Sequence, residues 1–148
     1  MKHFFCFSRK LLQPLVDVDL SDESFPISTT RLVKLAGRRL RAMRISFVGE
    51  LGWELHVPQE ACQDVYRALT EAGRAHGLRL AGYRAMYSLS AEKGYHLWHY
   101  DLRSDDNPVE AGLGFACREN GDYLGKEAVD ERRKRGITRR LAYFVTNE

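Results

Sequence analysis

The sequence has few cysteines, no long apolar run and no glycine-rich nucleotide fingerprint. Its three cysteines, Cys6, Cys62 and Cys117, are far apart and form no CxxC pair, which argues against a disulfide framework and against a zinc site. A reducing compartment suits such thiols best. No apolar stretch approaches the roughly 18 residues of a membrane-spanning helix, so we expect no membrane partner. The absence of a G-x-G-x-x-G motif argues against a dinucleotide-binding unit.

Composition and charge are those of an ordinary globular protein. The 148 residues are 44% hydrophobic and 29% charged, which is enough for one domain with a sizeable core. A formal net charge of +3 permits an anionic ligand without indicating nucleic acid. The basic run at 132–135 is either a nucleic-acid patch or a solvated helix end. The lack of interleaved aromatic residues favours the helix end, and we expect no nucleic-acid partner.

The segment 1–16 is basic and contains no acid. Its apolar cluster at 4–7 is too short for a secretory signal. A short mitochondrial presequence and a plain terminal segment both remain open.

Residues 43–57 predict a β-hairpin with an acid at its tip. Apolar and polar residues alternate from 43 to 47 and again from 53 to 57, as in two half-buried strands. Gly49 and Gly52 give the turn its backbone freedom and allow another molecule to approach closely. Glu50 is thereby presented as a binding carboxylate would be. An ordinary surface hairpin is the alternative.

Helical spacing follows the hairpin. Four side chains at i, i+3, i+4 and i+7 predict an amphipathic helix from about 62 to 77 that faces a core: Cys62, Val65, Tyr66 and Leu69. Another helix is predicted between Gly125 and Gly136. Before the hairpin, Thr29 or Thr30 is expected to cap a short helix that ends at Gly37, and alternation at 141–145 predicts a final strand.

Arg84 is expected in the first turn of a helix that begins after Gly82. A helix N-terminus already carries positive potential, so an arginine there suits an anion-accepting site. The alternative is an arginine that reaches back to a carboxylate such as Asp17 or Asp22.

The aromatic segment 95–100 contains His96 and His99 and is followed by Asp101. These three side chains suggest a metal site at first sight. The spacing lacks the rigid i, i+4 placement and a third ligand at a familiar interval, so we expect no metal. Trp98 and its neighbours are more typical of a pocket wall or a packing surface.

Four motifs together resemble the folate-binding aminomethyltransferases, the family of the glycine-cleavage T-protein. They are 46–58 (SFVGELGWELHVP), 81–95 (AGYRAMYSLSAEKGY), 101–103 (DLR) and 108–115 (PVEAGLGF). Within the family, the motifs are most similar to the folate-binding portion of the sarcosine dehydrogenases, followed by that of the dimethylglycine dehydrogenases. The resemblance implies an α+β fold: a non-family segment at 1–10, a partial T-protein-like folate-binding domain at 11–137, and the first strand of a truncated C-terminal β domain at 138–148.

The resemblance also implies a ligand, tetrahydrofolate. Glu50 matches the glutamate that accepts hydrogen bonds from the pterin ring, and Arg84 matches the arginine near the anionic glutamyl end. Phe115 and, more weakly, Trp98 match aromatic pocket walls, and Phe47 stands where the family usually has a tyrosine. In the dehydrogenases a flavin domain with FAD oxidises the N-methyl amine, and this domain accepts the one-carbon unit. The flavin domain of a full-length enzyme is therefore an expected partner, and the mitochondrial matrix the expected location.

Three departures limit what this chain is expected to do. Phe47 lacks the tyrosine hydroxyl, and Tyr87 replaces an acid beside Arg84. The family's catalytic aspartate lies in an upstream segment without a counterpart here, so we assign no catalytic residue and expect neither FAD binding nor sarcosine oxidation by this chain. A non-catalytic interaction module and a fragment that does not fold alone remain alternatives.

Overall fold

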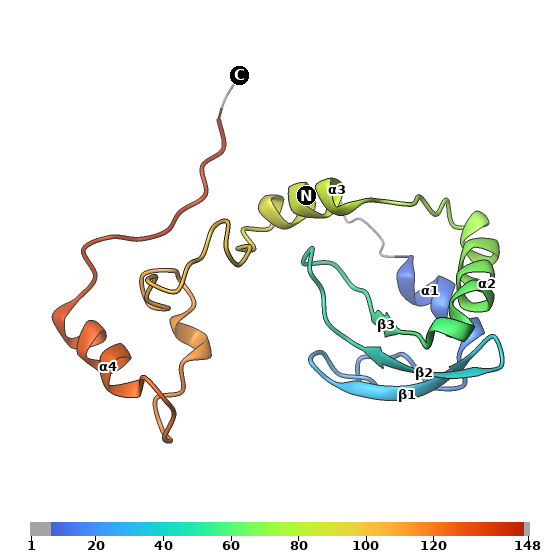
Figure 1. Cartoon of the computed structure of the whole chain (residues 1–148), viewed down its shortest axis with the longest axis horizontal. Coiled ribbons are helices and arrows are strands. Elements are labelled where there is room, and N and C mark those ends of the chain that lie inside the picture. The colour runs from blue at the N-terminus through green and yellow to red at the C-terminus, as the bar shows by residue number, and fades with distance from the viewer. Residues whose placement is uncertain (1–6, 147–148) are drawn as a thin grey trace. The chain divides into compact units, whose positions relative to one another are not determined.

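The computed structural model describes residues 7–146, which form two compact units that divide between Lys93 and Gly94. The first unit contains, in chain order, α1 (Ser8–Leu12), a 3₁₀ turn (Gln13–Leu15), β1 (Thr30–Leu35), β2 (Arg38–Met43), β3 (Glu54–His56), a second 3₁₀ turn (Gln59–Ala61), α2 (Cys62–Arg74) and α3 (Tyr83–Glu92) (Figure 1). The second unit contains a 3₁₀ turn (Gly114–Ala116) and α4 (Lys126–Arg135). Helices with a small antiparallel sheet confirm the predicted α+β class.

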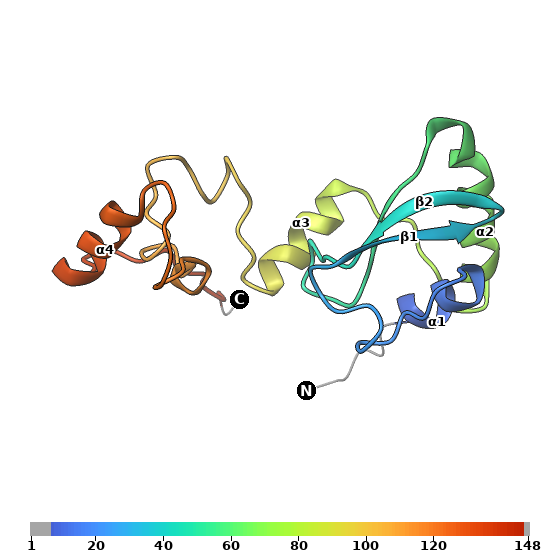
Figure 2. The ribbon, with the colours of Figure 1, turned by 90° about the horizontal axis from the view of Figure 1, so that it is seen from below.

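The sheet has the strand order β1-β2-β3, with both pairs antiparallel. Figure 2 shows β1 and β2 side by side, joined by a tight turn. Ala36 and Gly37 form this turn with φ values of 49° and 76°. Positive φ at both central residues matches the right-handed twist of the two strands.

The helix predicted from Thr29 or Thr30 to Gly37 is wrong, because β1 occupies this stretch. Val33 and Leu35 are buried while Lys34 between them is exposed, which is the period of a strand. The threonine and glycine that suggested helix ends instead begin a strand and form its hairpin turn.

One face of the sheet carries the core. Val33 lies opposite Leu40, and with Leu35 and Ala42 these side chains form a buried apolar surface. Leu12 of α1 and Val65 of α2 cover the surface, and the two helices lie on the same side of the sheet in Figure 1. The connection between α1 and β1 adds two fully buried side chains, Leu20 and Phe25.

The predicted helices after the hairpin are confirmed as α2, α3 and α4. The predicted core face of α2 is only partly correct. Val65 is buried and Leu69 is half-buried, but Cys62 and Tyr66 are exposed. Only the part of the apolar stripe around Val65 and Leu69 packs against the core.

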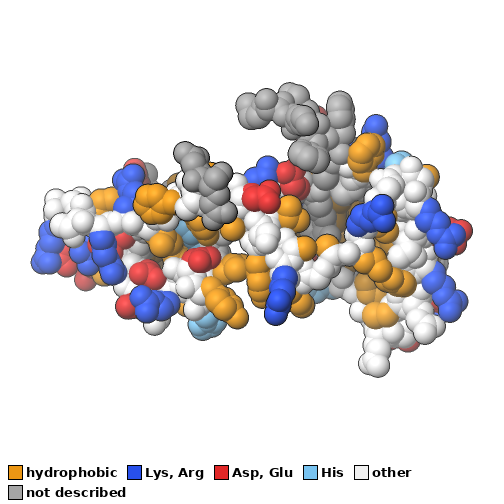
Figure 3. Space-filling model, turned by 90° about the horizontal axis from the view of Figure 1, so that it is seen from above, with side chains coloured by type: hydrophobic (Ala, Val, Ile, Leu, Met, Phe, Trp, Pro, Cys, Tyr) orange, Lys and Arg blue, Asp and Glu red, His pale blue; other side chains and the backbone are white. Residues whose placement is uncertain are grey.

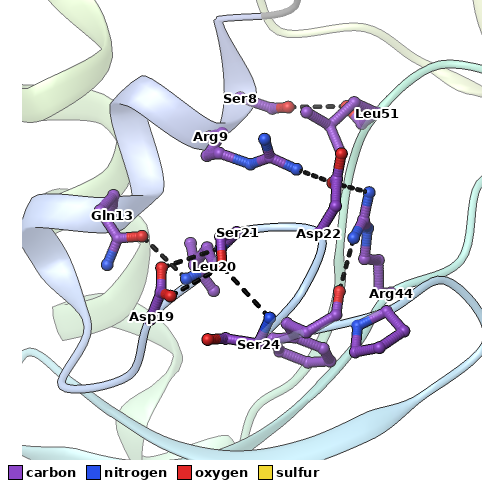
Figure 4. A network of polar contacts seen from close by, with 12 residues as sticks. Ser8, Arg9, Gln13, Asp19, Leu20, Ser21, Asp22, Ser24, Arg44 and Leu51 are labelled. Atoms are coloured by element: carbon purple, nitrogen blue, oxygen red, sulfur yellow. Dashed lines mark hydrogen bonds and ion pairs between the residues drawn. The ribbon is translucent and has the colours of Figure 1, made fainter.

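Polar contacts hold the connection between α1 and β1. Asp22 lies between Arg9 and Arg44 and pairs with both, and Arg44 also donates to the carbonyl of Phe25 at 2.5 Å (Figure 4). Hydrogen bonds from the Ser24 and Ser21 hydroxyls and from the Ser21 N–H lower the pKa of Asp19 to about 2. This segment therefore keeps its shape although it has no regular secondary structure.

A buried acid organises the second unit. Glu110 is 4% exposed, and its carboxylate lies 2.9 Å from Arg139 Nε and 3.3 Å from Arg132. Its carbonyl accepts the Leu141 N–H at 3.0 Å. Glu110 thus ties both α4 and the chain after α4 to the segment around residue 110.

The basic run at the end of α4 is largely paired. Arg132 contacts Glu110, Arg133 donates to the carbonyls of Gly114 and Cys117, and Arg135 pairs with Glu131. Figure 3 shows acidic side chains among the basic ones at the left end, where Figure 1 places α4. These contacts fit a helix end within the unit.

The final strand predicted at 141–145 is wrong, because residues 138–146 form no strand among the residues that the structure describes. The division into 1–10, 11–137 and 138–148 stays a prediction. Residues 1–6 and 147–148 lie outside the described residues. Among residues 7–146, no helix is long and apolar enough to cross a membrane.

Truncation of the most buried aromatic side chain should destabilise the first unit. We expect Phe25→Ala to lower the free energy of unfolding by about 3–5 kcal/mol, because it leaves a cavity in a fully packed site. Urea unfolding measures this. Phe144→Ala, at an 87% exposed position, is the matched control and should change little. An equal loss in both variants would contradict the assigned core.

Acid should destabilise the connection before β1. The pKa of Asp19 lies below its ordinary value of 3.8, so its contribution to stability is complete above about pH 4 and is lost as the pH falls toward about 2. Asp19→Asn and Ser21→Ala should both flatten the loss of stability in this window, as followed by urea unfolding at several pH values. A slope equal to that of the parent chain in both variants would contradict the assignment.

Candidate functional site

Loop 44–53 joins β2 to β3 and carries two of the predicted ligand contacts, Phe47 and Glu50. The predicted hairpin exists, but its first strand lies earlier than expected, because β2 spans Arg38–Met43 and most of the predicted stretch 43–47 is loop. The second strand is shorter than expected, because β3 spans only Glu54–His56. The backbone of Arg44 bonds to that of Ser28 and Thr29, just beyond the end of β1, and not to the chain before β3. Glu50 therefore lies on a wide loop and not at a tight turn.

Three hydrogen bonds that involve serine hydroxyl groups fix this loop. Ser8 of α1 donates to the carbonyl of Leu51 at 2.6 Å, and Ser90 of α3 donates to the carbonyl of Phe47 at 2.5 Å. Within the loop, the Glu50 N–H donates to the Ser46 hydroxyl at 2.9 Å. Gly49, with φ 70°, provides the reversal just before Glu50. The loop is thus held by one hydrogen bond from α1, one from α3 and one within the loop.

The carboxylate of Glu50 pairs with Lys93, whose Nζ lies 2.6 Å from Oε1. Both side chains are a little under half exposed, at 43% and 45%. A carboxylate offers about four lone-pair positions, so this ion pair leaves the second oxygen and part of the first able to accept further hydrogen bonds. Glu50 is therefore both oriented and accessible.

Arg84 lies in the first turn of α3, as predicted, and its side chain is exposed. Within residues 7–146 it forms no hydrogen bond or ion pair. The alternative that it reaches Asp17 or Asp22 is wrong: Asp17 accepts the Lys34 N–H, and Asp22 pairs with two other arginines. Positive charge at this helix end is thus available to an anion.

The remaining two predicted contacts belong to the second unit. Trp98 is exposed and packs edge-on against His99, with ring centroids 5.5 Å apart. Phe115, in the 3₁₀ turn Gly114–Ala116, is 87% exposed. Phe47, Glu50 and Arg84 belong to the first unit, so a single pocket formed by all five residues stays a prediction.

The first unit has an apolar groove of about 420 Å³ between α1, α2 and the end of the loop. Its lining includes Phe7, which stacks on His76, and Trp53, which packs edge-on against Phe25. Trp53 Nε1 is buried and has no partner among the described residues. Neither Glu50 nor Arg84 lines this groove, so the predicted ligand contacts lie outside it.

The histidines of the aromatic segment have structural neighbours. His96 stacks on Tyr143 with ring centroids 5.1 Å apart, and its Nε2 lies 3.2 Å from the carbonyl of Ala111. In the part of the chain that the structure describes, no three His, Cys, Asp or Glu side chains are placed to hold a metal ion. Burial and the charge of Asp101 raise the pKa of Tyr143.

Sequence reasoning missed three residues: Ser90, Lys93 and Glu110. Ser90 and Lys93 lie in a quoted motif, but nothing in that motif indicates that they contact a loop about 40 positions earlier. Glu110 also lies in a quoted motif. Its signal was the acid within an otherwise apolar run, because a charge in such a run has to be paired when buried.

Comparison with known proteins bears on the predicted family. A profile of the GCVT N-terminal domain matches residues 7–120. The chain is 54% identical over 143 residues to mitochondrial sarcosine dehydrogenase of Homo sapiens, which is 95% of this chain and 16% of the relative. It is 38% identical over 136 residues to mitochondrial dimethylglycine dehydrogenase of Homo sapiens, 90% of this chain and 16% of the relative. An aminomethyltransferase of Caldanaerobacter subterraneus subsp. tengcongensis is 35% identical over 138 residues, 93% of this chain and 37% of that protein.

These matches confirm the resemblance that the four motifs predict. The chain spans about a sixth of the length of the two dehydrogenases, whose remaining sequence lies outside the matched region. On the extent of the profile match and the identity to these relatives, the chain belongs to the aminomethyltransferase family of the GCVT N-terminal domain.

Proposed function

We propose that the chain is the tetrahydrofolate-binding part of an enzyme of the sarcosine dehydrogenase kind. The observation that carries this proposal is the placement of Glu50, a carboxylate oriented by Lys93 on a loop fixed by α1 and α3. Family membership and 54% identity to a sarcosine dehydrogenase support it.

The pterin ring and Glu50 are chemically matched. The ring presents an amino group and a ring N–H side by side, and a carboxylate accepts two such bonds at once. The exposed face of Phe47 lies three residues before Glu50 and offers an apolar surface to a flat ring. Arg84, at the positive end of α3, suits the anionic glutamyl end of the folate.

In the whole enzyme this part would be the acceptor half. When bound, tetrahydrofolate would take the one-carbon unit that a flavin domain releases by oxidising the N-methyl group of a methylated glycine. FAD would belong to that domain, which is the proposed partner, and this chain would hold only the folate. The mitochondrial location named for the two dehydrogenases supports the mitochondrial matrix as the compartment.

A non-catalytic interaction module is the second candidate. Large apolar side chains are exposed on and just before α3, with Leu80 and Tyr83 at 74% and 75% exposure. Such side chains are typical of a surface that another protein covers. In this interpretation the fold is kept and the ligand is lost.

Loss of the Glu50 charge should weaken folate binding. We expect Glu50→Gln to cost about 1.5–3 kcal/mol of binding free energy, because a charge-assisted hydrogen-bond pair to the pterin is lost. Titration calorimetry with tetrahydrofolate measures the affinity, and the upward shift of the melting midpoint provides a second readout. Glu54→Gln, an exposed acid that pairs with His56, is the matched control. Equal affinity of Glu50→Gln and the parent chain would contradict the role of Glu50.

Loss of the Arg84 charge should have a smaller effect that depends on salt. We expect Arg84→Ala to weaken the binding of tetrahydrofolate about twofold to fivefold at low ionic strength, because an exposed ion pair to the glutamyl carboxylates is lost. The difference should shrink at high salt. Arg79→Ala, in the connector before α3, is the control. An affinity unchanged at every salt concentration would favour the interaction module.

A further inference from the structure

The C-terminal end of α3 contacts loop 44–53 through two side chains, Ser90 and Lys93. We infer that Ser90 and Lys93 are positioning residues that hold the Glu50 carboxylate in the orientation that receives the pterin ring. This inference rests on the proposed function and assigns a role to two residues of α3 and its C-cap.

The two contacts have matching spacing. Ser90 and Lys93 are three positions apart at the end of α3, where such residues share one face of the helix. Their partners, Phe47 and Glu50, are also three positions apart. One helix end therefore fixes the backbone at one end of this short stretch and the carboxylate at the other.

Ser90 supplies the buried contact. It is 1% exposed, although most of α3 is exposed. Its hydroxyl donates to the Phe47 carbonyl at 2.5 Å. A buried hydroxyl without a partner is costly, and this hydrogen bond therefore favours the position in which the Phe47 carbonyl lies against Ser90.

Lys93 supplies the orienting contact. An ion pair between half-exposed side chains contributes little to stability, so its effect is expected in the geometry of Glu50. Lys93 bonds to Oε1 and leaves Oε2 and a lone pair of Oε1 for the ligand. The lysine therefore stays in place when the pterin binds, and holds one rotamer of a side chain that would otherwise sample several.

The test uses the 148-residue chain and tetrahydrofolate in titration calorimetry. We expect Lys93→Met to weaken binding about fivefold to tenfold, as for the loss of one charged hydrogen-bond partner. Lys93→Arg keeps the charge and should stay within about twofold of the parent chain. Lys126→Met removes a lysine with the same 2.6 Å distance to its partner, Asp130, and should leave the affinity unchanged.

A double-mutant cycle separates positioning from a general structural role. If Lys93 acts through Glu50, Lys93→Met should have no further effect in a Glu50→Ala background. A fivefold loss that persists in that background would overturn the inference. Equal or tighter binding by Lys93→Met in the parent background would also overturn it, since a lysine that competes with the pterin would give that result.

Hydrogen exchange tests, without any ligand, whether Ser90 holds loop 44–53 against α3. Ser90→Ala should speed the exchange of the amides at 46–51 and leave those of β1 and β2 unchanged. Unchanged exchange throughout would overturn only the role of Ser90 in holding the loop. Tetrahydrofolate binding by the parent chain would still support the proposed function. A parent chain that melts cooperatively but binds no tetrahydrofolate would instead overturn the proposed function and, with it, the role assigned to Lys93.

Discussion

The first unit depends on covering one apolar face of a small sheet. Val33, Leu35, Leu40 and Ala42 present that face, and only helices and buried side chains from both flanks can remove it from water. This requirement brings α1 and α2 onto the same side of the sheet. The same packing fixes the ends of β2 and β3, which are also the ends of loop 44–53. The position of Glu50 is therefore set first by the hydrophobic core and only then adjusted by polar contacts from α1 and α3.

The second unit is organised in a different way. Among its described residues only Ala111 and Val129 are buried apolar side chains, and the contacts converge on the buried carboxylate of Glu110. A buried charge is costly unless it is paired, and two arginines pair it. Such an arrangement depends on geometry more than on area, because removal of one partner leaves an uncompensated charge. The structure therefore contains one unit held mainly by apolar burial and one held mainly by ion pairs and backbone hydrogen bonds.

The sequence predicts the parts of the fold that follow from local periodicity. The apolar spacing identified α2, and the glycines around α4 marked both its ends, where Gly125 and Gly136 adopt φ values of 86° and 78°. Local sequence patterns gave the wrong prediction where the structure of a segment depends on pairing with another strand. Thr30 and Gly37 have the residue types of helix ends, but the pairing of β1 with β2 makes this stretch a strand and its hairpin turn. In the site, glycines revealed the loop that carries Glu50, whereas Ser90 and Phe47, 43 positions apart, meet only through tertiary packing.

The chain has two tryptophans, and each unit contains one of them. Trp53 packs edge-on against the buried ring of Phe25, with its indole nitrogen out of contact with water, whereas Trp98 is exposed. The emission of an indole shifts to longer wavelength when water reaches the ring. Trp53 therefore reports the opening of the first unit by a change in emission colour, and Trp98 contributes a nearly constant red-shifted background. The intrinsic fluorescence of the unlabelled chain thus follows one unit selectively.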